Sequence, residues 1–266
     1  MLRFGWAFRP MRSEDIPEAL EIIWQHDADD YKWAKAAFTA AGVDNHFVLV
    51  RRSRVAGMTG FRRDPGTNRT CWLSWTYLKS DLRGRRLGRY MLDRLLDRLK
   101  KEKARKLFVS TSDWTDRKRR QIYRNAMQLY ASVGFSTELV HHDYYMPGES
   151  QIILGLRLMP AVPPQGRQAH RSGIAATDLV PIGETKDAWA VAWQRTPADQ
   201  HRPDTLAEAL TLARAHQARV VFIRLPSPAA AATSGPLAAS GFTPAGRLTD
   251  YYADGIDDCH FRLDRK

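Results

Sequence analysis

Cysteine is scarce in this sequence, and long apolar runs are missing from it. The 266 residues include two cysteines, Cys71 and Cys259, which match no metal-binding spacing and are too few for a disulfide scaffold. No stretch approaches the roughly 18 uninterrupted apolar residues of a membrane-spanning helix. The first ten residues lack the apolar core of a secretory signal. We therefore expect a protein of the reducing cytoplasm without a metal site.

The positive charge of the chain is concentrated in its first part. The composition is that of a globular protein, with 44% hydrophobic and 26% charged residues, which excludes disorder or coiled coil as the main state. Residues 1–159 hold 29 Lys and Arg against 18 Asp and Glu, whereas residues 160–266 hold 12 against 11, within a net charge of +12. The basic first part predicts an anionic partner, either nucleic acid or a phosphate-bearing cofactor.

Apolar periodicity divides the first part into strands and helices in the order β-α-α-β-β-β-α-β-α-β-β. A helix is predicted from Ser13, and the others cover 29–41, 86–103 and 117–133. The predicted strands cover 6–10, 46–51, 55–61, 70–78, 106–112, 135–145 and 151–159. This order predicts an α/β fold with a mixed sheet flanked by helices.

Part of the same pattern returns after residues 160–173, which we interpret as a linker. A strand is predicted at 188–195, a helix at 205–216 and a strand at 219–225. Three pairs of residues recur with a spacing of 107 positions: Asp143 and Asp250, Gly134 and Gly241, and Gly148 and Gly255. We interpret 174–266 as a truncated internal repeat that lacks the first strand, the first two helices and the following hairpin.

The segment 77–92 joins a strand to the most strongly amphipathic helix through a short basic loop. The unpaired N–H groups at the start of a helix, together with the helix dipole, bind phosphate groups. Gly84 and Gly88 allow the backbone to approach a ligand closely. Four side chains add positive charge: Arg83, Arg85, Arg86 and Arg89. The segment therefore predicts a phosphate or pyrophosphate site.

This segment resembles motif A of the Gcn5-related N-acetyltransferase (GNAT) family, [Gln/Arg]-x-x-Gly-x-[Gly/Ala]. Arg83 takes the first position and Gly88 the last, while Arg86 replaces the middle glycine; we expect a negative φ for Arg86. The stretch Ala126-Met-Gln-Leu-Tyr130-Ala-Ser-Val-Gly-Phe135 matches a second family pattern, Ala-x-x-Leu-Tyr-x-x-x-Gly-Phe. The resemblance covers about 1–159 and implies a GNAT domain, followed by a degenerate GNAT-like half-domain at 174–266.

The resemblance also implies acetyl-coenzyme A as donor, an amine as acceptor and no metal. It implies that Tyr130 protonates the leaving thiolate, and that the backbone of Tyr77, Leu78 and Lys79 pairs with the pantetheine arm. Tyr123 stands where the family often has an asparagine, and we include it among the cofactor contacts. The remaining implied cofactor contacts form the loop and the helix start: Arg83, Gly84, Arg85, Arg86, Leu87, Gly88 and Arg89.

The general base is not evident, because the strand at 70–78 contains no carboxylate. Asp113 is the first candidate, His141 and His142 are alternatives, and deprotonation through water is also open. Some of the tryptophans could hold an ammonium group against a ring face. The basic run 117–120 could bind an acidic acceptor, the ribose phosphate of the cofactor or RNA.

We predict acetyl transfer to a small-molecule amine in a ternary complex, since an added half-domain could enclose a pocket. In the repeat, 199–204 contains no glycine, and Pro203 stands within it, so we expect no cofactor there. Two alternatives remain open. One is a Fem-like transferase that depends on aminoacyl-tRNA, which the basic first part would suit. The other is a non-catalytic protein that binds acyl-coenzyme A or RNA.

Overall fold

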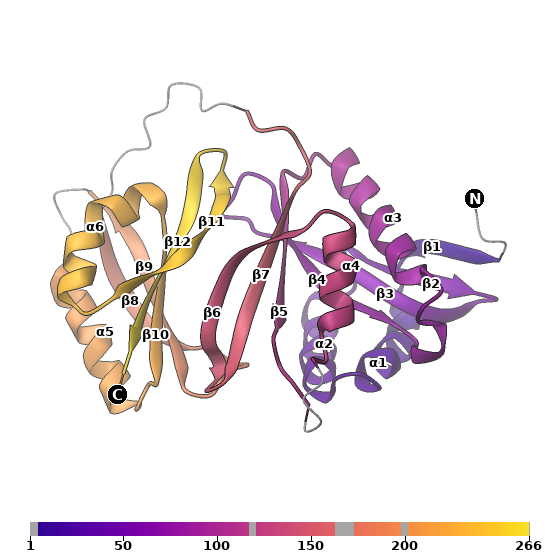
Figure 1. Cartoon of the computed structure of the whole chain (residues 1–266), viewed down its shortest axis with the longest axis horizontal. Helices are drawn as coiled ribbons and strands as arrows, with labels where there is room; N and C mark the ends of the chain where they lie inside the picture. Colours follow the sequence, from indigo (N-terminus) through magenta and orange to yellow (C-terminus); the bar gives the residue numbers. More distant parts are fainter. Residues whose placement is uncertain (1–4, 117–120, 163–172, 198–201, 266) are drawn as a thin grey trace.

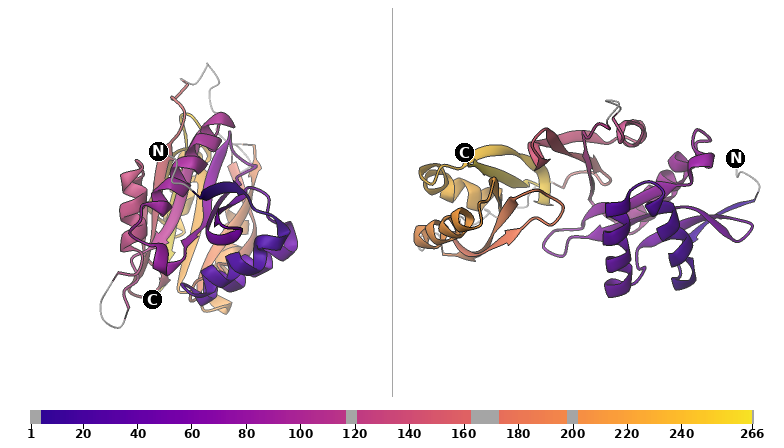
Figure 2. Two further views of the ribbon diagram at one scale, coloured as in Figure 1. Left: turned by 90° about the vertical axis from the view of Figure 1, so that its right-hand side faces the viewer. Right: turned by 90° about the horizontal axis from the view of Figure 1, so that it is seen from below.

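The computed structural model describes residues 5–116, 121–162, 173–197 and 202–265, which form two units end to end (Figures 1 and 2). Each unit has its own sheet. The first has seven strands in the order β1-β2-β3-β4-β5-β7-β6, and the second has five in the order β11-β12-β10-β9-β8. Among the described residues, no helix combines the length and apolar character needed to cross a membrane.

The elements of the first unit follow the predicted order, and the predicted fold class is confirmed. Its strands are β1 Trp6–Pro10, β2 His46–Arg51, β3 Arg54–Arg63, β4 Thr70–Leu78, β5 Lys106–Ser112, β6 Ser136–Met146 and β7 Glu149–Arg157. Its helices are α1 Ile16–Trp24, α2 Ala28–Ala41, α3 Leu87–Lys101 and α4 Arg124–Ser132. The helix predicted from 117 begins only at Arg124; the basic run 117–120 lies outside the described residues.

Helices cover both faces of the first sheet. On one face, α1 and α2 bury Ile22, Ile23 and Phe38 against β2 and β3. On the other face, the leucine stripe of α3 packs with α4 and the sheet; its fully buried residues include Leu92, Leu95 and Leu99. The helical spacing of these apolar residues explains why each helix lies flat on the sheet.

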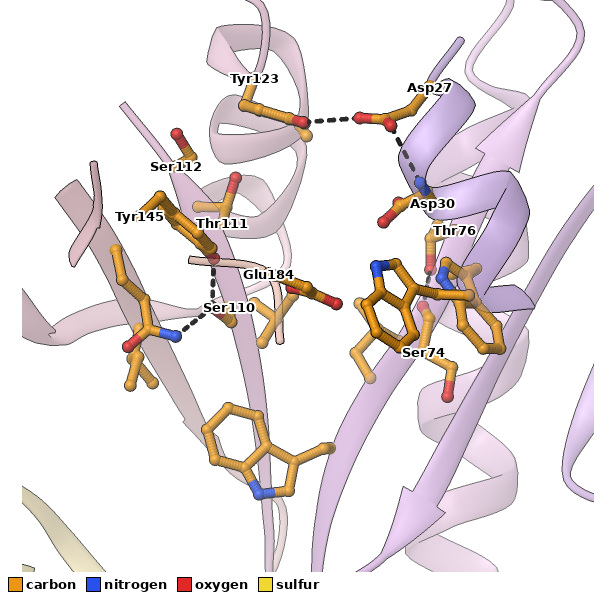
Figure 3. Close-up of a pocket in the computed structure, with 18 of the residues that line it drawn as sticks. Asp27, Asp30, Ser74, Thr76, Ser110, Thr111, Ser112, Tyr123, Tyr145 and Glu184 are labelled. Atoms are coloured by element: carbon orange, nitrogen blue, oxygen red, sulfur yellow. Dashed lines mark hydrogen bonds between the residues drawn. The ribbon is translucent and has the colours of Figure 1, made fainter. Parts of the chain in front are cut away.

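The first sheet opens in its middle. Strands β4 and β5 are parallel and pair only at Thr70 with Lys106, Cys71 with Leu107 and Trp72 with Phe108. Beyond Trp72, β4 stays paired with β3, and beyond Phe108, β5 stays paired with β7. The second halves of β4 and β5 therefore form two walls with a gap between them, as Figure 3 shows.

Four elements of the second unit lie outside the three ranges predicted for it. Its strands are β8 Gly173–Pro181, β9 Ala188–Thr196, β10 Val220–Pro226, β11 Thr243–Ala253 and β12 Ile256–Asp264, and its helices are α5 Pro203–Ala215 and α6 Ser227–Ala239. These four elements are β8, α6, β11 and β12. Since β8 pairs antiparallel with β9, it has the place that β3 has beside β4, whereas the sequence indicated no counterpart of that hairpin.

The two units repeat the same local geometry at the positions matched in sequence. Asp143 and Asp250 both have a φ of 53°. Each accepts a hydrogen bond of 2.6 Å through Oδ1, from the N–H of Gly148 and of Gly255 respectively. Strands β9 and β10 are also parallel and pair at three positions, as β4 and β5 do. These agreements support the interpretation of an internal repeat.

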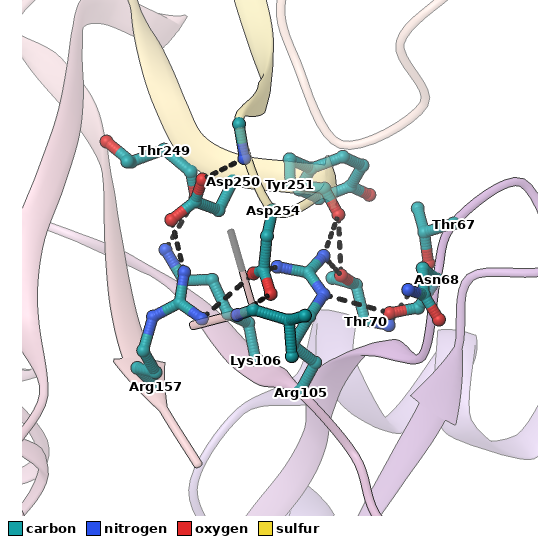
Figure 4. A network of polar contacts seen from close by, with 12 residues as sticks. Thr67, Asn68, Thr70, Arg105, Lys106, Arg157, Thr249, Asp250, Tyr251 and Asp254 are labelled. Carbon is teal, nitrogen blue, oxygen red and sulfur yellow. Dashed lines mark hydrogen bonds and ion pairs between the residues drawn. The ribbon is translucent and has the colours of Figure 1, made fainter. Parts of the chain in front are cut away.

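A buried ionic network joins the units (Figure 4). Arg105, of which 5% is exposed, donates to Asp254 Oδ1 at 3.0 Å and to the carbonyl of Tyr251 at 2.9 Å. Arg157 donates to the same Asp254 oxygen at 2.9 Å and also pairs with Asp250. Because the charge of Arg105 is largely out of water, it depends on its partner Asp254.

An aromatic contact lies beside this network. Tyr251 of the second unit packs against Trp72 and Phe108 of the first. Its hydroxyl accepts a hydrogen bond from Trp72 Nε1 at 2.9 Å and donates to Asp64 Oδ2 at 2.5 Å. The face of the first sheet at the base of the gap is thus covered by the second unit.

Two histidines are buried where β6 meets β12. His141 Nε2 lies 2.8 Å from His260 Nδ1, and His260 Nε2 lies 3.1 Å from Asp258 Oδ2. Burial and the nearby charges of His260, Arg262 and Arg224 lower the pKa of His141 to about 3. Burial also lowers the pKa of His260. The neighbouring His142, the other histidine considered as a base, is exposed, and its carbonyl accepts from Arg262.

Because the pKa values of both buried histidines are lowered, we expect the protein to lose stability in mild acid. The folded pKa of His141 lies below the unfolded value of about 6.5, so protons bind the unfolded chain first as the pH falls below 6.5. We expect the free energy of unfolding, measured in urea, to be about 2 kcal/mol lower at pH 5 than at pH 7 from this group. His141→Phe should flatten the dependence, whereas His142→Phe should not. Equal stability of the wild type at both pH values would contradict this assignment.

Candidate active site

The gap between β4 and β5 opens into a cavity of about 2860 Å³ that both units line. Figure 3 shows Ser74 and Thr76 on one wall, Ser110, Thr111 and Ser112 on the other, and Glu184 between the walls. The start of α3 lines one region of the cavity with Arg83, Gly84, Arg86 and Gly88. The volume exceeds that of a typical pocket for one small molecule, and it suits two substrates together.

The predicted phosphate loop leads into the start of α3. Gly84 has a φ of 74° and open space around it, while a Cβ on Gly88 would lie 3.3 Å from Leu129 Cδ2. Arg89 donates to the carbonyl of Ser132 at 2.7 Å and thereby ties α3 to α4. Arg83 Nη2 lies 3.0 Å from His26 Nδ1. Arg85 is exposed and is not among the residues that line the cavity.

Arg86 adopts a left-handed conformation, so the expected negative φ was wrong. Its φ is 60° and its ψ is 15°, because the loop turns at this residue immediately before α3 begins at Leu87, which is buried. This is the position where motif A usually has glycine, which adopts positive φ without strain. An arginine there costs roughly 1–2 kcal/mol. Its side chain is exposed and places a positive charge beside the helix start.

The end of β4, where we expect the pantetheine arm, already has several polar contacts. The carbonyl of Leu78 lies 2.9 Å from His26 Nε2, and the N–H of Lys79 donates to the carbonyl of Ala56 at 2.9 Å. The hydroxyl of Tyr77 donates to Asp30 Oδ2 at 2.5 Å. Burial and the charge of Asp30 raise the pKa of Tyr77. The pairing of this strand with a cofactor stays a prediction.

Tyr130 reaches the cavity from α4. Its ring is buried against Phe135, yet the side chain lines the cavity. Within the described ranges, no hydrogen bond to its hydroxyl occurs. Burial, and secondarily the charge of Asp30, raise the pKa of Tyr130 to about 12. The hydroxyl therefore keeps its proton at neutral pH and has that proton available for a group in the cavity.

The two remaining predicted site residues, Tyr123 and Asp113, differ in their position relative to the cavity. Tyr123 lines the cavity, and its hydroxyl donates to Asp27 Oδ2 at 3.0 Å. Asp113 is not among the lining residues. Its Oδ1 accepts from the N–H of Ser150 at 2.7 Å, which joins the end of β5 to β7. A role of Asp113 in proton transfer stays a prediction.

Three carboxylates at the cavity were missed by sequence reasoning. Asp27 directly precedes α2 and caps it: its Oδ1 accepts hydrogen bonds from the N–H groups of Asp29 and Asp30 at 2.9 and 3.0 Å. Asp30 lies one turn further on, and Glu184 comes from the loop between β8 and β9. The run of acids at 27–30 is visible in the sequence. By contrast, nothing in the sequence indicates that residue 184 reaches the first unit.

Comparisons with known proteins agree with this geometry. The sequence model of the acetyltransferase (GNAT) family matches residues 8–135. The first unit of this chain therefore belongs to the GNAT family and is an acyltransferase domain. No curated protein sequence matches the chain.

Solved structures of the same fold cover the first unit. A protein assigned to the GNAT family, from Desulfovibrio desulfuricans, is 20% identical over 58% of this chain and 100% of its own, with a TM-score of 0.52. The ribosomal-protein-S18-alanine N-acetyltransferase of Escherichia coli is 21% identical over 60% of this chain and 98% of its own, with a TM-score of 0.49. At these identities the similarity concerns the fold.

Proposed function

We propose that the protein transfers the acetyl group of acetyl-coenzyme A to a small-molecule amine, by direct attack in a ternary complex. The observation that carries this proposal is the side chain of Tyr130, which lines a cavity between two separating strands and whose hydroxyl has no hydrogen-bond partner among the described residues. The start of α3, with Arg83, Arg86 and Gly88, lines the same cavity and suits a pyrophosphate. A cofactor bound there would direct its thioester toward Tyr130.

The residues present support a simple sequence of bond changes. The amine nitrogen, once deprotonated, attacks the thioester carbon and forms the new C–N bond. The C–S bond then breaks, the thiolate of coenzyme A takes the proton of Tyr130, and the Tyr130 oxygen regains a proton, through water, from the proton that the nitrogen loses after the C–N bond has formed. We propose that the proton of the amine leaves through water, and Asp113 stays the sequence-based candidate for a residue that assists it. Backbone N–H groups at the end of β4 would stabilise the developing oxyanion.

We further propose the domain boundaries expected from the sequence: 1–159 as catalytic domain, 160–173 as linker and 174–266 as a degenerate GNAT-like half-domain. In this half-domain the gap between β9 and β10 is bridged, since Trp193 Nε1 donates to the carbonyl of Arg224 at 2.7 Å. In this half-domain the helix α5 stands where α3 stands in the first unit, and it begins at Pro203. Residues 199–201 lie outside the described residues. Both features support an absence of cofactor binding in the second unit.

Gly88→Glu tests the cofactor site. The added carboxylate would stand at the start of α3, repel a pyrophosphate and press against Leu129. Isothermal titration with acetyl-coenzyme A should show at least tenfold weaker binding than in the wild type. Gly235→Glu is the control, because Gly235 has open space around it and does not line the cavity. Unchanged binding by Gly88→Glu, or wild-type protein that binds tRNA but no coenzyme A, would refute the proposed site.

A further inference from the structure

Part of the cavity lining carries negative charge from both units. Asp27 and Asp30 lie at the start of α2, and Glu184 lies in the 182–187 loop of the second unit. In Figure 3, Glu184 lies between the two walls, with Asp30 and Thr76 on one side and Ser110 and Tyr145 on the other. The second unit thus places a carboxylate inside the cavity that the gap in the first sheet creates.

None of these three carboxylates makes an ion pair within the described part of the chain; Lys32, which also lines the cavity, pairs with Asp29 instead. Tyr123 donates to Asp27 and Tyr77 donates to Asp30, but both donors are neutral. Glu184 makes no hydrogen bond or ion pair with any described residue. Burial raises the pKa of Glu184, and the charges of Asp30 and Asp27 raise it further. Burial likewise raises the pKa of Asp30. A bound cation would relieve the repulsion among all three.

The position of Glu184 is held by contacts on both sides of its loop. The N–H of Lys186 donates to the carbonyl of Tyr145 at 2.6 Å, which fixes the loop to β6. Within the loop, Thr185 Oγ1 donates to the carbonyl of Ile182 at 2.7 Å. Gly183 packs against Trp33 of α2, since a Cβ on this glycine would lie 3.1 Å from Trp33 Cη2. The loop therefore bridges β6 and α2 and presents Glu184 from a fixed place.

Aromatic rings line the same cavity as these carboxylates and offer a surface for a cation. Trp33, Trp75 and Trp114 line the cavity, and 45% of Trp33 and 39% of Trp114 are exposed. Ring faces of this kind attract ammonium groups. Of the positive side chains that line the cavity, Arg83, Arg86 and Arg89 come from the start of α3, whereas Lys32 and Lys186 come from the same elements as the carboxylates.

The chemistry of the reaction decides which ammonium group the carboxylates would bind. The attacking amine must be neutral when it forms the C–N bond. Carboxylates that held this amine in its charged form would raise its pKa and oppose the attack. A second ammonium on the same molecule stays charged throughout the reaction, so carboxylates can bind it equally before and during the transfer.

We therefore propose that the acceptor is a small molecule with at least two amino groups, and that Glu184 binds the ammonium that is not acetylated. This inference rests on the proposed function and specifies its substrate class. The role of Glu184 is specificity, because it contacts the acceptor away from the reacting nitrogen. The second unit then selects the acceptor for a reaction that the first unit performs.

A binding experiment tests the inference independently of turnover. Wild-type protein saturated with coenzyme A is titrated calorimetrically with 1,4-diaminobutane and with 1-aminobutane, which has the same chain length and one charge fewer. We expect the diamine to bind at least tenfold more tightly. Glu184→Gln should abolish this preference while leaving the affinity for coenzyme A unchanged. Glu208→Gln is the matched control, because it removes the same charge at an exposed site outside the cavity.

Thiol release from acetyl-coenzyme A gives the second readout. With the diamine, Glu184→Gln should raise KM at least tenfold and change kcat little, while both parameters for the monoamine stay near those of the wild type. Equal binding of the two amines, or a diamine preference that survives Glu184→Gln, would overturn the inference and leave the proposed function standing. Absence of acetyl-coenzyme A binding would refute the proposed function itself.

Discussion

Replacing Tyr130 by phenylalanine is expected to lower kcat by roughly 10²–10³-fold, the usual contribution of a well-placed general acid. The ring and its packing against Phe135 remain, so only the proton donor for the leaving thiolate is lost. The affinity for acetyl-coenzyme A should stay within about twofold of the wild type. Thiol release measures the first quantity, and isothermal titration measures the second.

The control for this variant is Tyr90→Phe, which removes the hydroxyl of a half-buried tyrosine on α3 that does not line the cavity. The pH profile gives an independent check. Since burial raises the pKa of Tyr130 to about 12, the wild-type rate should not decline through loss of this proton below about pH 11. If Tyr130→Phe retained full kcat, the tyrosine would serve packing alone.

Asp254→Asn is expected to be the most destabilising of the conservative changes at the boundary between the units. It removes the counter-charge of Arg105, of which 5% is exposed, and weakens the hold on Arg157. Leaving a buried charge without its partner costs about 3–5 kcal/mol. Urea unfolding at pH 7 should show this loss in the free energy of unfolding.

Asp264→Asn is the matched control for this change. It makes the same substitution in the same unit, but 62% of the Asp264 side chain is exposed and it pairs with Arg262 at 2.5 Å. Exposed pairs contribute about 1 kcal/mol or less, so the control should unfold almost as the wild type does. Comparable stability of the two variants would show that the network of Figure 4 is not needed for cohesion between the units.

The element order of the first unit was predictable because each element there has a clear pattern of its own. The leucines of α3 repeat with helical spacing, and motif A marks the turn before it. In the second unit, the strand Gly173–Pro181 has no clean alternation and follows directly on a stretch that reads as a linker. The helix Ser227–Ala239 is rich in alanine and contains Pro236, so its apolar residues define no single face.

The site was predictable where it is local in sequence and unpredictable where it depends on tertiary contact. The loop at 83–89 and Tyr130 belong to motifs that are visible in the chain. The conformation of Arg86 was not, since arginine is an unusual residue for positive φ. Glu184 lies more than 150 positions from Asp27 and Asp30, and tertiary contacts of the β8–β9 loop with β6 and with Trp33 bring it to them.

The contacts of Tyr251 and Asp254 have a consequence for the synthesis of the chain. Trp72 meets Tyr251 across 179 positions, and Arg105 meets Asp254 across 149. Translation proceeds at about 5–20 residues per second. The aromatic face of the first sheet is therefore complete several seconds before the hairpin that covers it has been made. During that interval the nascent chain exposes Trp72 and Phe108, so its yield in cells should depend on chaperones that shield such surfaces until translation has passed residue 254.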